Sequence, residues 1–324
     1  MNTAQPLKGV ILNQNPATTK PKCWYREEDM LIPIANVPLI EWILEGYKQV
    51  GIRETLISIG PDSHQISTFC GDGSRWNMTL TYNDENTTNF TNILESQIST
   101  FTEKASLLVT LGPILLGEEV YRKAVCQLID NPSKCICLWQ NYIEDTSPQT
   151  VSLGVYLLSS NMYQQLCKIS QLKTWRSGFD QIPYLSFCDN SDILKLAVSQ
   201  QPYSAQSPEI YLDSNKRMIK CGNQKNFIPK IIADNFSSPN LVLRPPVLVA
   251  PKAELERCQI GPGVCLGHGV YVGHGTIIEN SVVMPGADIG DGASISHAII
   301  GRNETVENRS VIHGNSDQVI TVPS

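Results

Sequence analysis

Hydrophobic and polar positions follow two different periods along the chain, and the change between them marks two regions. In the first region short apolar runs alternate with amphipathic stretches. This pattern predicts strands at 8–12, 54–60, 78–82, 106–111 and 151–158, and helices at 38–50, 91–101, 117–128 and 208–219. A strand, a helix and a second strand in succession form a βαβ unit. We therefore expect an α/β domain with a mostly parallel sheet.

A six-residue period begins after residue 245. Apolar residues recur at Ile260, Leu266, Val272 and Ile278, then at Ile289 and Ile295, and glycines follow at Gly261, Gly267 and Gly273. This repeat predicts a parallel β-helix, in which three strand-and-turn repeats make one coil and glycine permits the tight turn. From Ile278 to Ile289 the offset is eleven (289 − 278), so we expect the register to slip once, near Pro285.

These patterns give a domain division. We expect an N-terminal domain at 1–220, a proline-containing linker at 221–245, a β-helix at 246–313 and a tail at 314–324. The β-helix has room for about four coils. A stack this short leaves a coil end exposed, which favours capping or association.

Composition narrows the function classes. The chain has 324 residues, 41% of them hydrophobic, which excludes a disordered chain. Its 31 acidic and 25 basic residues give a net charge of −6 and argue against nucleic-acid binding. Neither a membrane span nor a secretory signal is apparent, so we expect no membrane partner and a cytoplasmic location.

The chain has 10 cysteines, which are scattered and include no Cys-x-x-Cys pair. We expect them to be structural thiols in a reducing compartment rather than metal ligands. Cys135 and Cys137 would point the same way if they lie on one strand.

Several longer motifs carry a family resemblance. They are KGVIL at 8–12, LIPIANVPLIEWILEGYKQVGI at 31–52, GDGSRW at 71–76, GVYLL at 154–158 and SPEIYLDSNKRMI at 207–219. With the β-helix tail, they resemble the sugar-1-phosphate nucleotidyltransferases, such as mannose-1-phosphate guanylyltransferases and glucose-1-phosphate thymidylyltransferases. These enzymes make nucleotide-sugars from an NTP and a sugar phosphate. The resemblance implies a Rossmann-like nucleotidyltransferase domain with a mostly parallel sheet, followed by a short left-handed parallel β-helix.

The chain departs from this family where the resemblance places its chemistry. The phosphate-binding loop has no glycine at 13–19. By the resemblance, Thr19 stands for an arginine, Asp29 and Asp145 for lysines, and Pro113 and Ser204 for the aspartates that hold Mg²⁺. A carboxylate in place of a lysine beside a triphosphate opposes binding by several kcal/mol at an effective dielectric of about 20.

We therefore expect a degenerate, catalytically impaired family member with a regulatory or scaffolding role. No catalytic residue or metal ligand is assigned, and no cofactor is expected (Mg²⁺ if the protein is active). The resemblance implies substrate-binding positions at Leu12, Gly112, Glu144 and Gly154, whose other interpretation is maintenance of the fold. The partners it implies are a nucleotide-sugar or sugar phosphate, together with a second copy or an active relative.

Two alternatives stay open. The first is an active nucleotidyltransferase with a rebuilt site, for which Asp72, Asp84 and Glu85 lie in suitable loops without support from a family position. The second is a β-helix acyltransferase or metal-binding protein that uses its histidines. His268 and His274 are six residues apart and are expected to stack on adjacent coils, with His297 nearby; a solvated role is favoured for all of them.

Overall fold

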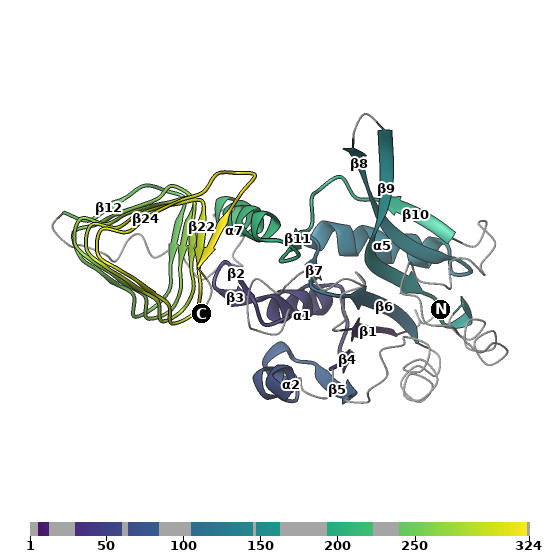
Figure 1. Ribbon diagram of the computed structural model, residues 1–324. Coiled ribbons are helices and arrows are strands. Elements are labelled where there is room, and N and C mark those ends of the chain that lie inside the picture. Colours follow the sequence, from purple (N-terminus) through teal and green to yellow (C-terminus); the bar gives the residue numbers. More distant parts are fainter. Residues whose placement is uncertain are drawn as a thin grey trace, which may run out of the picture. The chain divides into compact units, whose positions relative to one another are not determined.

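The computed structural model describes residues 6–12, 30–59, 64–83, 105–144, 147–162, 193–222 and 240–322, without the side chains of 141–144 and 147–151. The chain divides into two compact units (Figure 1). The α/β unit comprises Met1–Lys20, Glu28–Leu31 and Leu39–Pro202, and the β-helix unit comprises Pro21–Glu27, Ile32–Pro38 and Tyr203–Ser324.

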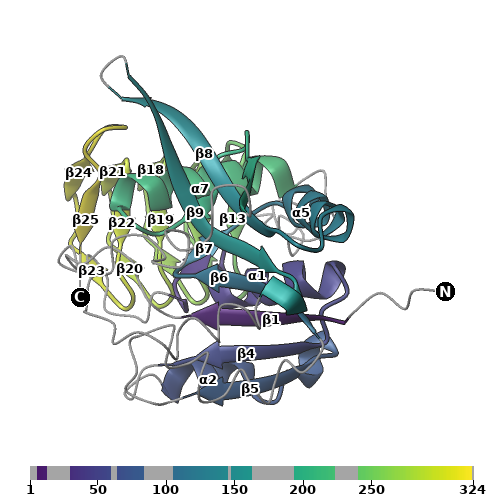
Figure 2. The same ribbon diagram turned by 90° about the vertical axis from the view of Figure 1, so that its right-hand side faces the viewer.

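A seven-stranded sheet forms the centre of the α/β unit, in the order β10-β8-β9-β6-β1-β4-β5 (Figure 2). Its strands are β1 (Leu7–Leu12), β4 (Glu54–Ser58), β5 (Thr79–Asn83), β6 (Ser106–Leu111), β8 (Cys135–Glu144), β9 (Ser147–Leu158) and β10 (Ile193–Ala197). Strands β5, β4, β1 and β6 are parallel neighbours, and β9 runs antiparallel to both β6 and β8. The predicted mostly parallel sheet is therefore confirmed.

Helices α1 (Leu39–Gln49), α2 (His64–Cys70) and α5 (Glu118–Asp130) belong to the same unit, with the 3₁₀ turn η1 (Ser74–Trp76) and the short strand β7 (Ile114–Leu115). The first βαβ unit is β1-α1-β4, and its strands pair in parallel as predicted. Helix α1 buries Leu39, Ile43, Leu44 and Tyr47, because these residues share one face at helical spacing. The predicted helix at 91–101 lies outside the described residues.

Several elements of the α/β unit were not predicted. Strand β8 has a mixed composition, CICLWQNYIE, without regular alternation, and its partner β9 supplies the pairing. Helix α2 has seven residues, too few to show a helical period. Strand β10 lies at an edge of the sheet and is only half-buried along much of its length.

The β-helix unit contains a helix and a hairpin as well as coils. Helix α7 (Pro208–Gly222) packs beside the hairpin of β2 (Pro33–Ile34) and β3 (Val37–Pro38). The hydroxyl of Tyr211 donates to the carbonyl oxygen of Pro33 at 2.7 Å. A further short strand, β11 (Tyr203–Ser204), precedes this helix.

Fourteen short strands form three parallel faces of the β-helix. Face 1 contains β12 (Val242–Leu243), β15 (Gln259–Ile260), β18 (Ile277–Glu279), β21 (Ser294–Ser296) and β24 (Val311–His313). Face 2 contains β13 (Val247–Val249), β16 (Val264–Leu266), β19 (Val282–Val283), β22 (Ala298–Ile300) and β25 (Ile320–Val322). Face 3 contains β14 (Glu254–Leu255), β17 (Tyr271–Val272), β20 (Asp288–Ile289) and β23 (Thr305–Val306).

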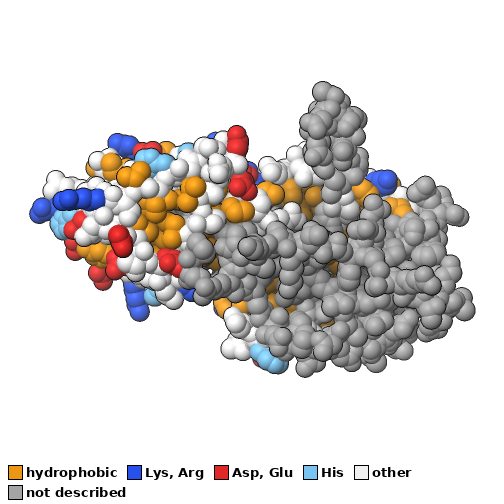
Figure 3. All heavy atoms as spheres, viewed as in Figure 1, with side chains coloured by type: hydrophobic (Ala, Val, Ile, Leu, Met, Phe, Trp, Pro, Cys, Tyr) orange, Lys and Arg blue, Asp and Glu red, His pale blue; other side chains and the backbone are white. Residues whose placement is uncertain are grey.

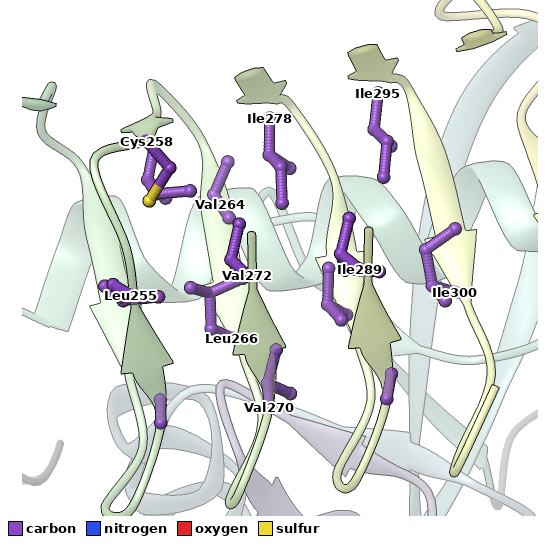
Figure 4. Close-up of a cluster of buried hydrophobic side chains, with 14 of the residues drawn as sticks. Leu255, Cys258, Val264, Leu266, Val270, Val272, Ile278, Ile289, Ile295 and Ile300 are labelled. Atoms are coloured by element: carbon purple, nitrogen blue, oxygen red, sulfur yellow. The ribbon is translucent and has the colours of Figure 1, made fainter. Parts of the chain in front are cut away.

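The six apolar residues of the predicted repeat all belong to one buried cluster inside the coils (Figure 4). Most coils repeat every 17 residues, as in the pairing of Tyr271 with Asp288 (288 − 271). One interval has 18 residues, between Gln259 and Ile277 (277 − 259). Figure 3 shows that charged and hydrophobic side chains intermix on the visible surface of these coils.

Two details of the predicted repeat were wrong. The offset of eleven between Ile278 and Ile289 contains a further inward residue, Val283, so the shortened turn lies between Ile278 and Val283 rather than near Pro285. Gly267 also has no unusual φ. A Cβ at Gly267 would come within 2.5 Å of the backbone nitrogen of Pro285, so glycine is required there by close packing between coils and not by turn geometry.

Candidate functional site

The strand order creates a switch point between β1 and β6. From β1 the chain proceeds outward through β4 to β5 and then returns to form β6 on the other side of β1. Ligands of open α/β sheets bind in the crevice outside the carboxyl ends of the strands at such a point. The carboxyl ends of these two strands are Leu12 and Leu111, which are paired in register.

Gly112 joins the two strand ends. Its backbone N–H donates to the carbonyl oxygen of Leu12 at 2.9 Å, and its φ of +73° lies in the left-handed region. Glycine adopts this conformation without the steric penalty of a side chain. The peptide at this position therefore turns away directly from the end of β6.

Gly154, on β9, approaches the same place. A Cβ at Gly154 would lie 3.1 Å from the carbonyl oxygen of Leu111, and its φ is +69°. Both the conformation and the lack of space require glycine here. Three of the predicted binding positions, Leu12, Gly112 and Gly154, thus converge around the end of β6.

Glu144 lies elsewhere. It is the last residue of β8 and pairs with Ser147 at the far end of the long β8–β9 hairpin. Leu138 lies opposite Gly154, within the irregular part of the pairing between Cys137 and Trp139. An extended strand covers roughly 20 Å from Leu138 to Glu144. The structure therefore does not place the Glu144 backbone beside the other three positions.

The described strand ends at the crevice carry no carboxylate. Strands β1, β4, β5 and β6 end in Leu12, Ser58, Asn83 and Leu111, and Pro113 follows Gly112. Mg²⁺ is a hard cation that proteins hold mainly through carboxylate oxygens and water. The described residues at this edge therefore do not fit a magnesium site. Thr19, Asp29, Asp84, Glu85 and Asp145 lie outside the described residues.

Two further residues from the sequence analysis have structural surroundings. Asp72 accepts a hydrogen bond from the backbone N–H of Ser74 at 2.9 Å, which lowers the pKa of its carboxyl group. Ser204 lies in the β-helix unit and is buried, and its backbone N–H donates to Ser214 Oγ at 3.0 Å. Asp72 thus orders its own turn.

A buried network supports the crevice from within the sheet, and the sequence analysis missed it. The hydroxyl of Tyr47 donates to Thr110 Oγ1 at 2.8 Å, next to the end of β6. Burial raises the pKa of Tyr47 well above its usual value, so the phenol stays a neutral donor. Tyr47 reads in the sequence only as part of the apolar face of a helix.

The histidines do not stack, so that expectation was wrong. His268 follows a strand of face 2, His274 follows a strand of face 3 and His297 follows a strand of face 1. Residues six apart lie at successive corners of one coil, whereas stacked positions are 17 apart, as in Tyr271 and Asp288.

His274 has structural partners. Its backbone N–H donates to Asp291 Oδ1 at 2.7 Å, and its ring Nε2 lies 2.7 Å from Glu256 Oε2. Among the residues that the structure describes, no group of three or more His, Cys, Asp or Glu side chains could hold a metal ion. The described histidines therefore do not form the shared metal site that stacking would have given.

The cysteines match a structural role where they are described. Cys135 and Cys137 lie on β8 with Sγ atoms 3.8 Å apart, which confirms that they point the same way. Burial raises the pKa of the Cys70 and Cys265 thiols to about 12 and that of Cys258 to about 11. Such thiols stay protonated and unreactive near neutral pH.

Comparison with known proteins identifies the C-terminal region. Residues 243–322 match the family model of the GMPPB C-terminal domain. The chain is 30% identical over 77 residues to the low-salt glycan biosynthesis nucleotidyltransferase Agl11 of Haloferax volcanii, a stretch that covers 24% of this chain and 22% of that protein. Within the described segments, no helix is both long and apolar enough to cross a membrane. With its mostly parallel α/β sheet and its parallel β-helix, the chain is a sugar-1-phosphate nucleotidyltransferase-like protein.

Proposed function

We propose that this chain is a catalytically impaired member of its family that serves as a regulatory or scaffolding subunit in sugar-nucleotide metabolism. Its crevice at β1 and β6 binds a nucleotide-sugar or a sugar phosphate. The observation that carries the proposal is Gly112-Pro113 at the end of β6, where the described strand ends offer backbone groups and no carboxylate.

The argument against catalysis is electrostatic. Transfer of a nucleotidyl group brings two anions together, so it depends on metal ions and cationic side chains that neutralise the developing charge. Pro113 has neither a charge nor a side-chain oxygen. The sequence also places Asp29 where the resemblance expects a lysine.

The argument for binding rests on the glycines. Gly112 and Gly154 keep the backbone around Leu111 narrow, because both adopt left-handed conformations and neither adds a side chain. Backbone N–H groups can approach the phosphates of a ligand at such places. A protein that binds a nucleotide-sugar without making it can act as a sensor, because ligand binding shifts its conformational equilibrium.

In this proposal the partner of the complex is an active relative or a second copy, and the site of action is the cytoplasm. The match of residues 243–322 to a family of C-terminal domains supports a shared assembly region. The chain spans about a fifth of the curated relative it matches, so the whole protein's activity belongs to the proposal.

Thermal unfolding of the full chain tests the proposal against a panel of NTPs, sugar phosphates and nucleotide-sugars, each with and without Mg²⁺. A ligand at 100 times its Kd adds about 2.7 kcal/mol to the free energy of unfolding. We expect one nucleotide-sugar or sugar phosphate to raise Tm independently of Mg²⁺, with no release of pyrophosphate from an NTP and a sugar phosphate. Mg²⁺-dependent pyrophosphate release would overturn the loss of catalysis, and no shift with any ligand would overturn the binding role.

A further inference from the structure

The outward-facing rows of the three β-helix faces differ in chemistry, and the difference bears on what covers each face. The row on face 1 is Val242, Gln259, Ile277, Ser294 and Val311. The row on face 2 is Leu248, Cys265, Val282, Ile299 and Thr321. The row on face 3 is Glu254, Tyr271, Asp288 and Thr305.

Faces 2 and 3 show two opposite solutions. On face 2 the apolar side chains of Leu248, Val282 and Ile299 are at most 3% exposed, and helix α7 packs against strands β16 and β22 of that face. On face 3 acidic Glu254 and Asp288 are exposed. An apolar outward row is therefore covered in this domain, and a charged row faces water.

Face 1 has aliphatic side chains like a covered face but lacks a cover among the described residues. Val242, Ile277 and Val311 are 42%, 37% and 71% exposed. They are the large hydrophobic residues of the β-helix that stand out as exposed in the described part of the chain. Aliphatic residues aligned in one row form a patch and are not scattered singly, and such patches mark interaction sites.

The charges on face 1 neutralise one another. Arg244 Nη1 lies 3.4 Å from Glu279 Oε1, and Arg244 Nη2 donates to Gln259 Oε1 at 3.3 Å. His313 Nε2 and Ser294 Oγ are 2.8 Å apart. The face is therefore close to neutral, although the chain carries a net charge of −6.

We propose that face 1 is a docking surface for face 1 of a second copy of this chain. A two-fold interface brings each patch against itself, so it requires a self-complementary surface. The row alternates aliphatic and small or amide side chains symmetrically about Ile277, which lies on the middle strand of the five. Two copies of an acidic protein repel each other least where the surface is neutral.

The size of the patch fixes the strength of the contact. Five strands at about 4.8 Å spacing extend roughly 24 Å, with a width of about three residues. This area is well below the ~800 Å² per partner of a standard stable interface. The dimer is therefore weak and depends on concentration. Because repulsion between the acidic chains opposes it, added salt strengthens it.

Sedimentation velocity of the full chain over a wide concentration range tests the surface. Ile277→Glu places two like charges face to face near the two-fold axis, and we expect it to raise the dimer dissociation constant at least tenfold. Thr305→Glu adds the same charge at an exposed outward position on face 3 and serves as the matched control. Circular dichroism and Tm of each variant verify that the coils remain folded.

The expected result is a monomer–dimer equilibrium that Ile277→Glu removes, that Thr305→Glu leaves in place and that strengthens from low to moderate salt. A wild-type chain that stays monomeric at every concentration overturns the proposal. So does a dimer that Ile277→Glu leaves intact, or one that Thr305→Glu disrupts equally. This test uses no ligand, so its outcome is separate from that of the proposed binding function.

Discussion

The side-chain oxygen of Asn215 accepts a hydrogen bond from the backbone N–H of Ala35 at 2.8 Å, across 180 residues of sequence. Ala35 lies at the tip of the β2–β3 hairpin with a φ of 50°, a conformation that costs energy for a residue with a side chain. Asn36 beside it donates to the carbonyl oxygen of Leu266 at 2.8 Å. These bonds attach the hairpin to α7 and to the coils of the same unit.

Asn215→Ala should destabilise the β-helix unit. The Asn215 side chain is buried and also donates to Tyr211 O at 2.9 Å, so its removal leaves the Ala35 N–H without its acceptor. We expect a loss of about 1–3 kcal/mol in the free energy of unfolding, measured by urea denaturation. Asp213→Ala, on the same helix but in a surface ion pair with Arg217, should cost no more than ~1 kcal/mol. Equal effects of the two variants would contradict this role of Asn215.

Ile277 and Ile278 are neighbours in sequence with opposite orientations. Ile278 is 0% exposed inside the coils, whereas Ile277 is 37% exposed on face 1. We expect Ile278→Ala to cost about 2–5 kcal/mol, because it leaves a cavity that the stacked coils cannot close. Ile277→Ala should cost about 1 kcal/mol or less. Urea denaturation at low protein concentration compares them, and a reversed order would refute the assigned register.

Gly154→Ala should strain the strand end at the crevice. The variant adds both a left-handed alanine and a Cβ at 3.1 Å from Leu111 O. Gly51 has a φ of +87° with no atom within 4 Å of its Cβ position, so Gly51→Ala measures the conformational cost alone. We expect about 1–3 kcal/mol for Gly51→Ala and a larger loss for Gly154→Ala. The same two variants also test binding, since Gly154→Ala should weaken any nucleotide-sugar shift that Gly51→Ala preserves.

His297 makes stability depend on pH. Burial lowers the pKa of His297, with a further contribution from Lys216, while Glu279 opposes the shift. The folded state therefore favours the neutral ring, and its stability falls as pH drops through about 6.5, where the unfolded chain gains a proton. His297→Asn is the matched variant, because Asn280 occupies the equivalent turn with a φ of 45° and His297 has a φ of 48°.

The measurement for His297 is the change in unfolding free energy between pH 7.5 and pH 5. The wild-type chain should lose more stability over this interval than His297→Asn does. Identical losses would mean that His297 does not titrate differently in the folded and unfolded states.

Much of the framework follows from local pattern. The strand at 106–111 and the inward residues of the coils were predicted because burial on a regular element imposes a period on the sequence. The position of Val283 was missed because one turn is shorter than the others, which a search at fixed spacing cannot detect. The stacking of His268 and His274 was misjudged because stacking follows the whole coil and not the single repeat.

The candidate site was accessible to sequence reasoning only in part. The ends of β1 and β6 carry Leu12 and Gly112 side by side because adjacent parallel strands end at the same edge. Glu144 lies at the tip of a hairpin whose length depends on the pairing of β8 with β9. Thr110 and Tyr47 meet only through tertiary packing, and neither shows a sequence signal beyond its apolar surroundings.

One corner of the β-helix gives the stack a direction. The N–H of His274 donates to Asp291 Oδ1, and the N–H of Asp291 donates to Asn308 Oδ1 at 2.8 Å, so each acceptor lies one coil further toward the C-terminus. Shortening the stack from its C-terminal end thus removes an acceptor from each newly terminal coil. Shortening it from the other end leaves the acceptors of the remaining coils in place.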